Sequence, residues 1–281
     1  MATTPKFIKR SAITGITAIA VLALTFTSCD DGEIFPSEDT GTFRVILHDE
    51  PGDFEELWVD VQRVEVHRQQ EAESGWTVVS EPDQRYNILE LINGAQEILG
   101  EEELEEGTYR QIRLILGEDN TILVNGEEHN LQVPSGMQSG IKINIDADIT
   151  PGTEYNLLLD FDAKRSVVQR GQAQAGAPYL LRPVIRASHE AATGNISGDV
   201  EPVESHPWIH AVVGDDTLST TRADNETGEF MLVGLEEDTY DVHFDPAEGF
   251  EPEITEDVEV TARDTTELGT VELSEENNSS E

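Results

Sequence analysis

The chain has 281 residues, of which 58 are acidic and 17 basic, so its formal net charge at pH 7 is −41. Such a surface repels the phosphates of nucleic acid and anionic lipid headgroups alike, so any membrane contact requires a hydrophobic anchor. The length suits one large or two modest domains, and the single cysteine excludes an intramolecular disulfide.

The first 28 residues have the features of a secretory signal peptide. They contain three basic residues and no acid, and an apolar run over residues 13–26 leads into small residues. A basic region, an apolar region and small residues in this order are typical of a cleavable signal. The apolar run is too short and too interrupted to cross a membrane as a helix.

Cys29 follows the small residues directly, and the segment Phe26-Thr27-Ser28-Cys29 resembles a bacterial lipobox, with Phe26 where leucine is usual. The resemblance implies that Cys29 carries lipid on its sulfur, becomes the mature N-terminus and anchors the protein to a membrane. The alternative is an ordinary signal peptide with an incidental cysteine. The acids after Cys29 resemble the export signals of surface-exposed lipoproteins, which implies the outer face of the outer membrane, or else they belong to the general acidity.

The charge of the mature chain has two interpretations. Removal of residues 1–28 leaves 17 − 3 = 14 basic residues against 58 acidic ones, a net charge of −44, and only Lys142 and Lys164 remain of the lysines. Scattered acids with few lysines indicate a halophilic bacterium, because about 1 M salt shortens the Debye length to about 3 Å and screens self-repulsion. The alternative is an acidic calcium-binding surface.

Period-two alternation of apolar residues, the signature of half-buried strands, begins after a polar stretch that ends near residue 40. It covers residues 43–47, 57–66, 76–78, 109–116, 122–124, 131–133, 141–145, 155–161 and 179–187. The odd step between Val61 and Val64 predicts a bulge near Gln62 and Arg63. Asn125-Gly126 predicts a tight hairpin turn.

Two segments depart from this pattern. Residues 87–99 have mixed spacing, which we interpret as a strand followed by a short helical turn over 95–99, with an acidic loop over 101–106. Pro183 lies inside the last strand of the series, which predicts an edge strand because proline donates no ladder hydrogen bond. Many short strands between turn residues predict an all-β protein with two β-sandwich domains in tandem.

The predicted organisation places six segments in series. They are a lipoprotein signal peptide (1–28), an acidic tether (29–40), a first β-sandwich (41–187), a linker (188–193), a second β-sandwich (194–273) and a disordered acidic tail (274–281). The sequence Leu-Glu-Glu-Gly-Thr-Tyr at 104–109 returns as Leu-Glu-Glu-Asp-Thr-Tyr at 235–240. We interpret this similarity as the same kind of turn before an aromatic residue that begins a strand, a feature of β-sandwich corners, rather than as a duplication.

The second predicted domain resembles a known family. A polar turn leads into Gly228-x-Phe230, then Gly234-Leu235 and Thr239-Tyr240, a pattern similar to the carboxypeptidase regulatory-like domain. Asp238 stands where glycine is usual, and aspartate tolerates a left-handed turn. The resemblance implies a small transthyretin-like sandwich of seven strands, and it implies no chemistry.

The first predicted domain resembles the bacterial lipoprotein domain of unknown function 4382 (DUF4382). The resemblance rests on segments that begin at Leu47, Val59, Gly107, Val133, Ser139, Leu159, Ser166 and Leu181, among them Leu47-His-Asp-Glu-Pro51 and Leu181-Arg-Pro-Val-Ile185. It spans nearly the whole predicted domain. It implies architecture and an envelope location without a mechanism.

Four aspartates are candidate calcium ligands. Asp160 and Asp162 share one strand face, and Asp49 and Asp53 flank a turn. If these strand ends meet, their oxygens suit Ca²⁺, which takes six to eight oxygen ligands. The alternative is turn-capping aspartates beside Arg165 or Arg182, because the sequence has no 12-residue calcium loop.

Histidine and aromatic residues offer weaker candidates. His206 and His210 on one strand would lie about 13 Å apart, too far for one metal ion, so we interpret them as loop histidines. His48 and His67 are interpreted as structural or solvated. Trp58, Trp76, Trp208 and Tyr179 offer a sugar-stacking surface if they are exposed, or else they belong to the core and rim of the sandwiches.

The sequence contains no Gly-x-Ser-x-Gly, no phosphate loop and no Gly-x-Gly-x-x-Gly, so we expect no enzyme and assign no catalytic residue. We expect a lipid-anchored envelope protein, a non-enzymatic module that binds protein or polysaccharide and no nucleic acid. The alternative is an envelope hydrolase or a calcium-dependent carbohydrate-binding protein that uses clustered carboxylates. Cys29 is the one site assigned, and calcium is the one cofactor considered.

Overall fold

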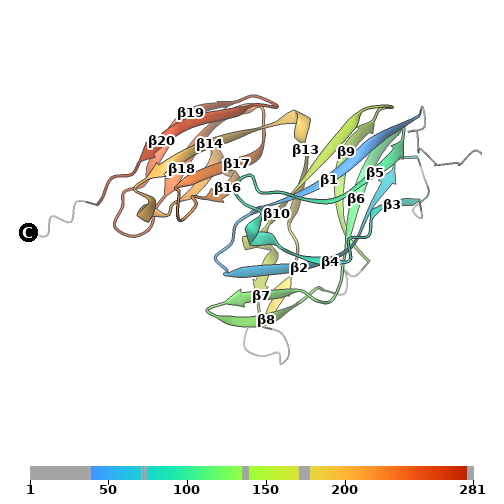
Figure 1. The fold of residues 1–281 in the computed structure, drawn as a ribbon, viewed down its shortest axis with the longest axis horizontal. Coiled ribbons are helices and arrows are strands. Elements are labelled where there is room, and N and C mark those ends of the chain that lie inside the picture. The colour runs from blue at the N-terminus through green and yellow to red at the C-terminus, as the bar shows by residue number, and fades with distance from the viewer. Residues whose placement is uncertain (1–38, 71, 73–74, 135–138, 171–177, 277–281) are drawn as a thin grey trace, which may run out of the picture. The chain divides into compact units, whose positions relative to one another are not determined.

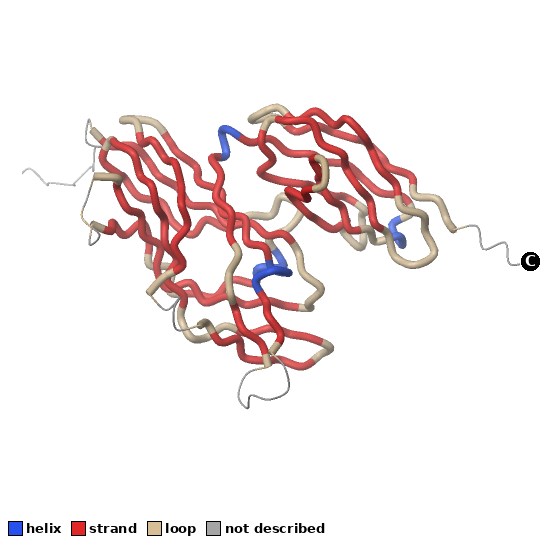
Figure 2. Tube along the Cα trace, turned by 180° about the vertical axis from the view of Figure 1, so that it is seen from behind, coloured by secondary structure: helices blue, strands red, loops and turns tan. Residues whose placement is uncertain are grey.

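The computed structural model describes residues 39–70, 72, 75–134, 139–170 and 178–276. The predicted signal peptide, Cys29, most of the predicted tether, residues 135–138 and 171–177 and the end of the predicted tail therefore lie outside the described residues. Strands make up most of the described chain, with a few short helical segments between them (Figures 1 and 2). The protein is all-β, as the alternation of its sequence predicted. None of the described helices is long and apolar enough to cross a membrane.

The described residues belong to one compact unit over residues 36–281. Within it the buried apolar side chains form two clusters, one drawn from residues 43–181 and the other from residues 196–273. We name the strands around the first cluster, β1 to β13, the first sandwich. The strands around the second cluster, β14 to β20, form the second sandwich.

The first sandwich has a sheet of four strands in the order β13-β10-β1-β5. These strands are β1 (Thr40–Glu50), β5 (Glu97–Glu105), β10 (Glu154–Asp162) and β13 (Ile185–His189). β1 and β10 pair in parallel, with Phe43 opposite Tyr155 and Leu47 opposite Leu159. This pairing joins segments more than 100 residues apart in the chain.

The other sheet of the first sandwich runs in the order β11-β12-β8-β7-β2-β6-β9, and β3 and β4 also pair with β2. The strands are β2 (Glu56–Arg68), β3 (Trp76–Ser80), β4 (Gln84–Asn87), β6 (Gly107–Leu116), β7 (Thr121–Val124), β8 (Glu127–Gln132), β9 (Ile141–Ile149), β11 (Val167–Gln169) and β12 (Tyr179–Leu181). Along β9 burial alternates without a break, so Ile141, Ile143 and Ile145 face the core.

The second sandwich packs a sheet in the order β17-β14-β20 against one in the order β16-β15-β18-β19. Its strands are β14 (Thr193–Glu201), β15 (Trp208–Val213), β16 (Asp216–Arg222), β17 (Glu229–Glu236), β18 (Asp238–Asp245), β19 (Glu253–Val260) and β20 (Thr265–Glu272). In its core Phe230 meets Phe244 edge to face at 5.6 Å between ring centroids.

Within the described ranges, four short helical segments connect the strands. They are η1 (Ile88–Glu90), α1 (Ala163–Ser166), η3 (Glu190–Ala192) and η4 (Val203–Ser205). The helical turn predicted over 95–99 is wrong, since η1 comes earlier. The acidic loop predicted over 101–106 is also wrong, because residues 97–105 form β5, an edge strand paired with β1. Its run of glutamates lies on an edge, where charge discourages pairing with other chains.

Pro183 does not lie within a strand as the alternation predicted. The expected strand over 179–187 is two strands, β12 and β13, which belong to different sheets. Residues 182–184 connect them, and Pro183 fits there because it has no N–H to donate to a ladder. The chain thus crosses from one sheet of the first sandwich to the other at the proline.

Two local predictions are confirmed. Asn125 and Gly126 join β7 to β8 with φ of 52° and 73°, the backbone that a tight hairpin turn requires. The register between β2 and β6 shifts between Val61 and Arg63, where the odd step in the alternation predicted a bulge. By contrast, Asp238 does not adopt the left-handed backbone that a glycine at this position would allow. It has ordinary strand backbone and begins β18.

Candidate functional site

The densest group of ionisable side chains lies where β1 and β10 end. Their parallel register places His48 beside Asp160 and Glu50 beside Asp162. β13 pairs with β10 on its other side and places Arg186 next to Asp160. Because side chains alternate along a strand, these residues share one face of the sheet, and Asp49 points to the opposite face. We call His48, Glu50, Asp160 and Arg186 the β1–β10 cluster.

Arg186 holds the β1–β10 cluster together. Its guanidinium donates to Asp160 Oδ2 at 2.7 Å and also forms an ion pair with Glu50. His48 Nδ1 lies 3.9 Å from Asp160 Oδ1, which is too long for a hydrogen bond. His48 Nε2 and Asp160 Oδ1 are buried and have no hydrogen-bond partner among the described residues. One cation therefore serves two carboxylates, and part of the cluster stays unsatisfied.

The neighbouring aspartates serve the backbone of α1. Asp49 Oδ1 accepts a hydrogen bond from the Ala163 amide at 3.2 Å, and Asp162 Oδ1 accepts one from the Arg165 amide at 2.8 Å. Asp162 is thus the N-cap of α1, the role that the turn-capping alternative assigned to it. Asp49 faces the first core and is 5% exposed.

Burial shifts the protonation of this region. Burial and the nearby Asp160 raise the pKa of Glu50 to about 8, although Arg186 acts in the opposite direction. Burial raises the pKa of Asp49 well above its ordinary value, and the nearby Asp160 carboxylate raises it further. Burial lowers the pKa of His48, against the attraction of Asp160. At neutral pH these shifts favour a protonated carboxyl at Glu50 and a neutral imidazole at His48.

The four predicted calcium ligands do not converge. Asp49 faces the core, Asp160 lies on the opposite face with Arg186, Asp162 caps α1, and Asp53 is exposed in the turn after β1. Within the part of the chain that the structure describes, no group of three or more His, Cys, Asp or Glu residues is arranged to hold a metal ion. Calcium binding by these residues stays a prediction.

A cavity of about 310 Å³ lies on the exposed side of the β1–β10 cluster. His48, Asp160 and Arg186 line it from the first sandwich, and Leu218, Gly234 and Tyr240 are among those that line it from the second. A side chain at Gly234 would start 3.6 Å from His48 Nε2, so glycine brings the backbone close to the imidazole. The second sandwich thus lies over His48 and Asp160, whereas the Arg186 side chain stays 47% exposed.

The predicted aromatic surface is dispersed, and each tryptophan is instead covered by cations. Arg85 lies 5.2 Å from the Trp58 ring, and Arg113 and Lys142 lie 4.2 and 5.5 Å from the Trp76 ring. Lys164 and Arg222 lie 5.6 and 5.1 Å from the Trp208 ring. Tyr179 packs on His129. These aromatic residues occupy four separate places, and each tryptophan has the cation–π geometry.

Of the two histidines predicted to lie in loops, His210 differs from its predicted place and His206 does not. His210 is a strand residue of β15, opposite Thr220 and His243, and its Nδ1 lies 3.0 Å from Thr220 Oγ1. The prediction of a loop histidine is therefore wrong for His210. The loop that contains Pro207 ends before Trp208, where β15 begins, so His210 lies inside the strand. His206 lies at the C-terminal end of η4 in left-handed backbone. The His67 ring lies tilted against Trp76, with ring centroids 5.1 Å apart.

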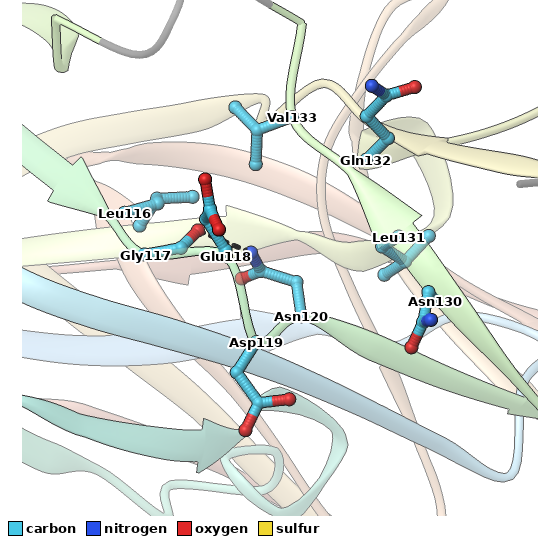
Figure 3. A pocket seen from close by; sticks show the side chains of 9 residues that line it. All are labelled: Leu116, Gly117, Glu118, Asp119, Asn120, Asn130, Leu131, Gln132 and Val133. Atoms are coloured by element: carbon cyan, nitrogen blue, oxygen red, sulfur yellow. Dashed lines mark hydrogen bonds between the residues drawn. The ribbon is translucent and has the colours of Figure 1, made fainter.

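A second cavity, of about 770 Å³, lies between the loop after β6 and strand β8. Figure 3 shows its lining, in which Glu118 and Asp119 point in different directions and Asn120 donates to the Gly117 carbonyl. The Asn120 side chain also accepts from the Asp60 amide at 2.9 Å. These contacts hold the loop in place. Glu118 and Asp119 do not converge on a common point in the cavity (Figure 3).

The fold thus defines an all-β protein of two sandwiches. The family model "Domain of unknown function (DUF4382)" matches residues 40–183, which are 144 of the 281 residues. The chain belongs to this DUF4382 family. A search of curated proteins found no match.

Several solved structures were also compared. The Bacillus anthracis TIE protein is 12% identical to this chain, with a TM-score of 0.23. The match covers 84% of this chain and 34% of the length of the TIE protein structure. The minor pilin GBS52 of Streptococcus agalactiae is 8% identical, with a TM-score of 0.23, and the match covers 83% of this chain and 96% of the pilin. The fimbrial anchor protein Mfa2 of Porphyromonas gingivalis is 9% identical, with coverages of 79% and 82% and a TM-score of 0.18. At these TM-scores the likenesses carry no argument about this chain.

Proposed function

We propose that this protein is a non-enzymatic binding or scaffolding module of the bacterial cell envelope, held at the membrane by lipid on Cys29. The segment around Cys29 supports the anchor, because small residues precede the one cysteine and an apolar run precedes them. The acids that follow Cys29 support a place on the outer face of the outer membrane. The membrane is then the first partner, and protein or polysaccharide is the second.

One observation carries the non-enzymatic assignment. Carboxylate catalysis needs acids that reach a substrate, with one available to donate and one to accept a proton. At the β1–β10 cluster, Glu50 and Asp160 share Arg186, Asp162 caps α1 and Asp49 faces the core. The second sandwich lies over His48 and Asp160 on the same face. The four acids are thus engaged by a guanidinium and by backbone amides of the first sandwich.

A carboxylate hydrolase is the second candidate, and one observation favours it. Asp49 and Glu50 both have raised pKa values, which is a common feature of catalytic acids. They lie on opposite faces of β1, however, so the two carboxyls do not flank a single bond of a substrate. We therefore keep the binding module as the proposed function.

The proposal is tested by exchanging Cys29. Cells that carry Cys29→Ser and cells that carry the wild type are grown with a clickable fatty acid and fractionated. We expect lipid label and membrane retention in the wild type, and neither in Cys29→Ser, because serine has no sulfur to acylate. Ser28→Ala is the matched control, since it keeps a small residue before the cysteine and leaves both readouts unchanged. Equal membrane retention without label in all three would contradict the proposal.

A further inference from the structure

Cations in this acidic chain are mostly paired with carboxylates. Eight arginines have a carboxylate oxygen within 4.0 Å, namely Arg44, Arg63, Arg68, Arg85, Arg110, Arg113, Arg165 and Arg186. Lys164 and Arg222 form no ion pair with any described residue, yet both lie within 6 Å of the Trp208 ring. Two unpaired cations thus meet at one indole in a protein with 58 acidic residues.

The two cations come from different elements. Lys164 is an exposed residue of α1, and Arg222 is a half-buried residue at the end of β16, paired in register with Trp208. Arg222 Nε is buried and has no hydrogen-bond partner among the described residues. The first and second sandwiches therefore each contribute one cation to the same aromatic side chain.

The surrounding sheet face extends this surface. In the next row across the strands, His210 of β15 lies beside His243 of β18, and His243 lies beside Ile254 of β19. Ile254 is 48% exposed, and both histidines are half-buried. We name the Trp208 face by its residues, Trp208, Lys164, Arg222, His210, His243 and Ile254. It combines an apolar platform with cations and hydrogen-bonding rings.

The sign of the charge on this face differs from that of its surroundings. Residues 194–273 contain 22 acidic and two basic residues, and one of the two is Arg222. Burial lowers the pKa of His210, Asp245 acts in the opposite direction, and Lys164 and His243 lower it further. Asp245 is the neighbour of Trp208 on β18, and it forms no ion pair with either cation within the described residues. The Trp208 face therefore brings two cations together in an acidic sandwich, with Asp245 as the acid in register with Trp208.

We propose that the Trp208 face binds an acidic polysaccharide, with its carboxylates on Lys164 and Arg222 and its hydroxyls on His210 and His243. Charge-assisted hydrogen bonds from lysine and arginine to carboxylates are stronger than neutral ones. The indole under the two cations holds them side by side, and the histidine rings supply hydrogen bonds to hydroxyls. The proposal deepens the proposed function and rests on it, because it names the partner class of that module.

The face favours a polysaccharide over an acidic peptide. A peptide that gains affinity from main-chain hydrogen bonds adds to an exposed sheet edge. Trp208 and His210 lie on β15, whose two edges are already paired with β16 and β18. Arg222 and Ile254 lie on the edge strands β16 and β19, but Trp208 and the two histidines at the centre of the face lie on the inner strands and offer only side chains. Uronic acid units present carboxylates and hydroxyls to such a surface without needing an edge.

The experiment is a calorimetric titration of the mature protein in detergent with polygalacturonate. Fully methyl-esterified polygalacturonate is the uncharged control ligand, and poly-L-glutamate represents an acidic peptide. The variants are Lys164→Gln with Arg222→Gln, and Lys164→Arg, which keeps the cation. Lys142→Gln is the matched control, since Lys142 also lies on a tryptophan without an ion pair among the described residues. Thermal melts establish that each variant is folded.

We expect wild type to bind polygalacturonate, with affinity that falls as salt rises, and not to bind the esterified polymer. The double variant should lose about tenfold or more in affinity, whereas Lys164→Arg and Lys142→Gln should stay within about twofold. No binding by the folded wild type, equal loss in Lys142→Gln, or tighter binding of poly-L-glutamate each overturns the proposal. Because Cys29 acylation is measured separately, a failure here leaves the envelope assignment standing.

Discussion

Asn93 of the first sandwich accepts a hydrogen bond from Thr221 Oγ1 of the second at 2.7 Å. Its Oδ1 also accepts from the Met231 amide at 3.3 Å, and its Nδ2 donates to the Arg222 carbonyl at 2.9 Å. Asn93 has a φ of 55°, a left-handed backbone that asparagine tolerates better than most residues. One side chain thus ties the loop after η1 to β16 and β17.

Asn93→Ala should weaken the contact between the sandwiches. It removes three hydrogen bonds between the sandwiches, so we expect a loss of about 1–3 kcal/mol in the free energy of unfolding. Urea denaturation measures it, and limited proteolysis at residues 188–193 should become faster. Asn144→Ala, at an exposed strand position, should change stability by less than about 0.5 kcal/mol. Equal losses in both variants would contradict the role of Asn93.

Glu50 should make stability fall as pH rises. Folded Glu50 keeps its proton up to a pKa of about 8, whereas the unfolded chain releases it near 4.5, so unfolding releases a proton between these values. Between pH 6.5 and 8 the free energy of unfolding of wild type should decrease, and in Glu50→Gln this slope should be shallower by about 1 kcal/mol per pH unit. Urea titrations across this range measure both slopes. Parallel slopes would show that Glu50 does not titrate as described.

Tyr109 and Tyr240, which end the two similar Leu-Glu-Glu segments, should each stabilise their sandwich through one hydrogen bond. Tyr109 Oη donates to the Glu105 carbonyl at 3.2 Å, and Tyr240 Oη donates to the Glu236 carbonyl at 2.9 Å. Tyr240→Phe removes one buried donor, so we expect a loss of about 0.5–1.5 kcal/mol. Tyr179→Phe is the control, because Tyr179 packs on His129 and is not fully buried. If chemical denaturation finds Tyr240→Phe as stable as wild type, the corner hydrogen bond contributes nothing.

Salt should stabilise the folded chain. With −41 formal charges on 281 residues, the compact state is strained by self-repulsion, which salt screens. We expect the melting temperature to rise steadily from dilute buffer to about 1 M potassium chloride. Sucrose at matched osmolality is the control for nonspecific exclusion. A melting temperature that is equal in dilute buffer and in molar salt would exclude salt adaptation.

Calcium should leave the melting temperature unchanged. Asp49, Asp160 and Asp162 already accept hydrogen bonds from the Ala163 amide, Arg186 and the Arg165 amide, and a calcium ion would have to displace these partners. Scanning calorimetry with calcium and with chelator, at constant ionic strength, makes the comparison. A rise in melting temperature that depends on calcium concentration and disappears in Asp160→Asn would restore these residues as ligands.

Local features of the fold could be predicted because neighbouring residues determine them. The alternation of Ile141, Ile143 and Ile145, the turn at Asn125-Gly126 and the shared Leu-Glu-Glu segments before Tyr109 and Tyr240 all match the structure. Strand β5 was missed because an edge strand with one buried face can carry glutamates at most positions. Its pairing with β1 overrides the weak strand preference of those residues.

The β1–β10 cluster could not be predicted, because it depends on contacts distant in sequence. Asp160 and His48 meet through a parallel pairing between segments more than 100 residues apart, and Arg186 joins them from a third strand. Glu50 and Arg186 are ordinary charged residues in an acidic sequence. The Trp208 face was missed for the same reason, since Lys164 and Arg222 belong to different sandwiches.

The measurement that tests the central claim most directly is protease shaving of intact cells at their native salt concentration, followed by immunoblotting of this protein. The proposed surface module predicts that the full-length band disappears while a periplasmic marker protein stays intact. Protection that is lost only after the outer membrane is permeabilised would place the two sandwiches in the periplasm and contradict a surface location.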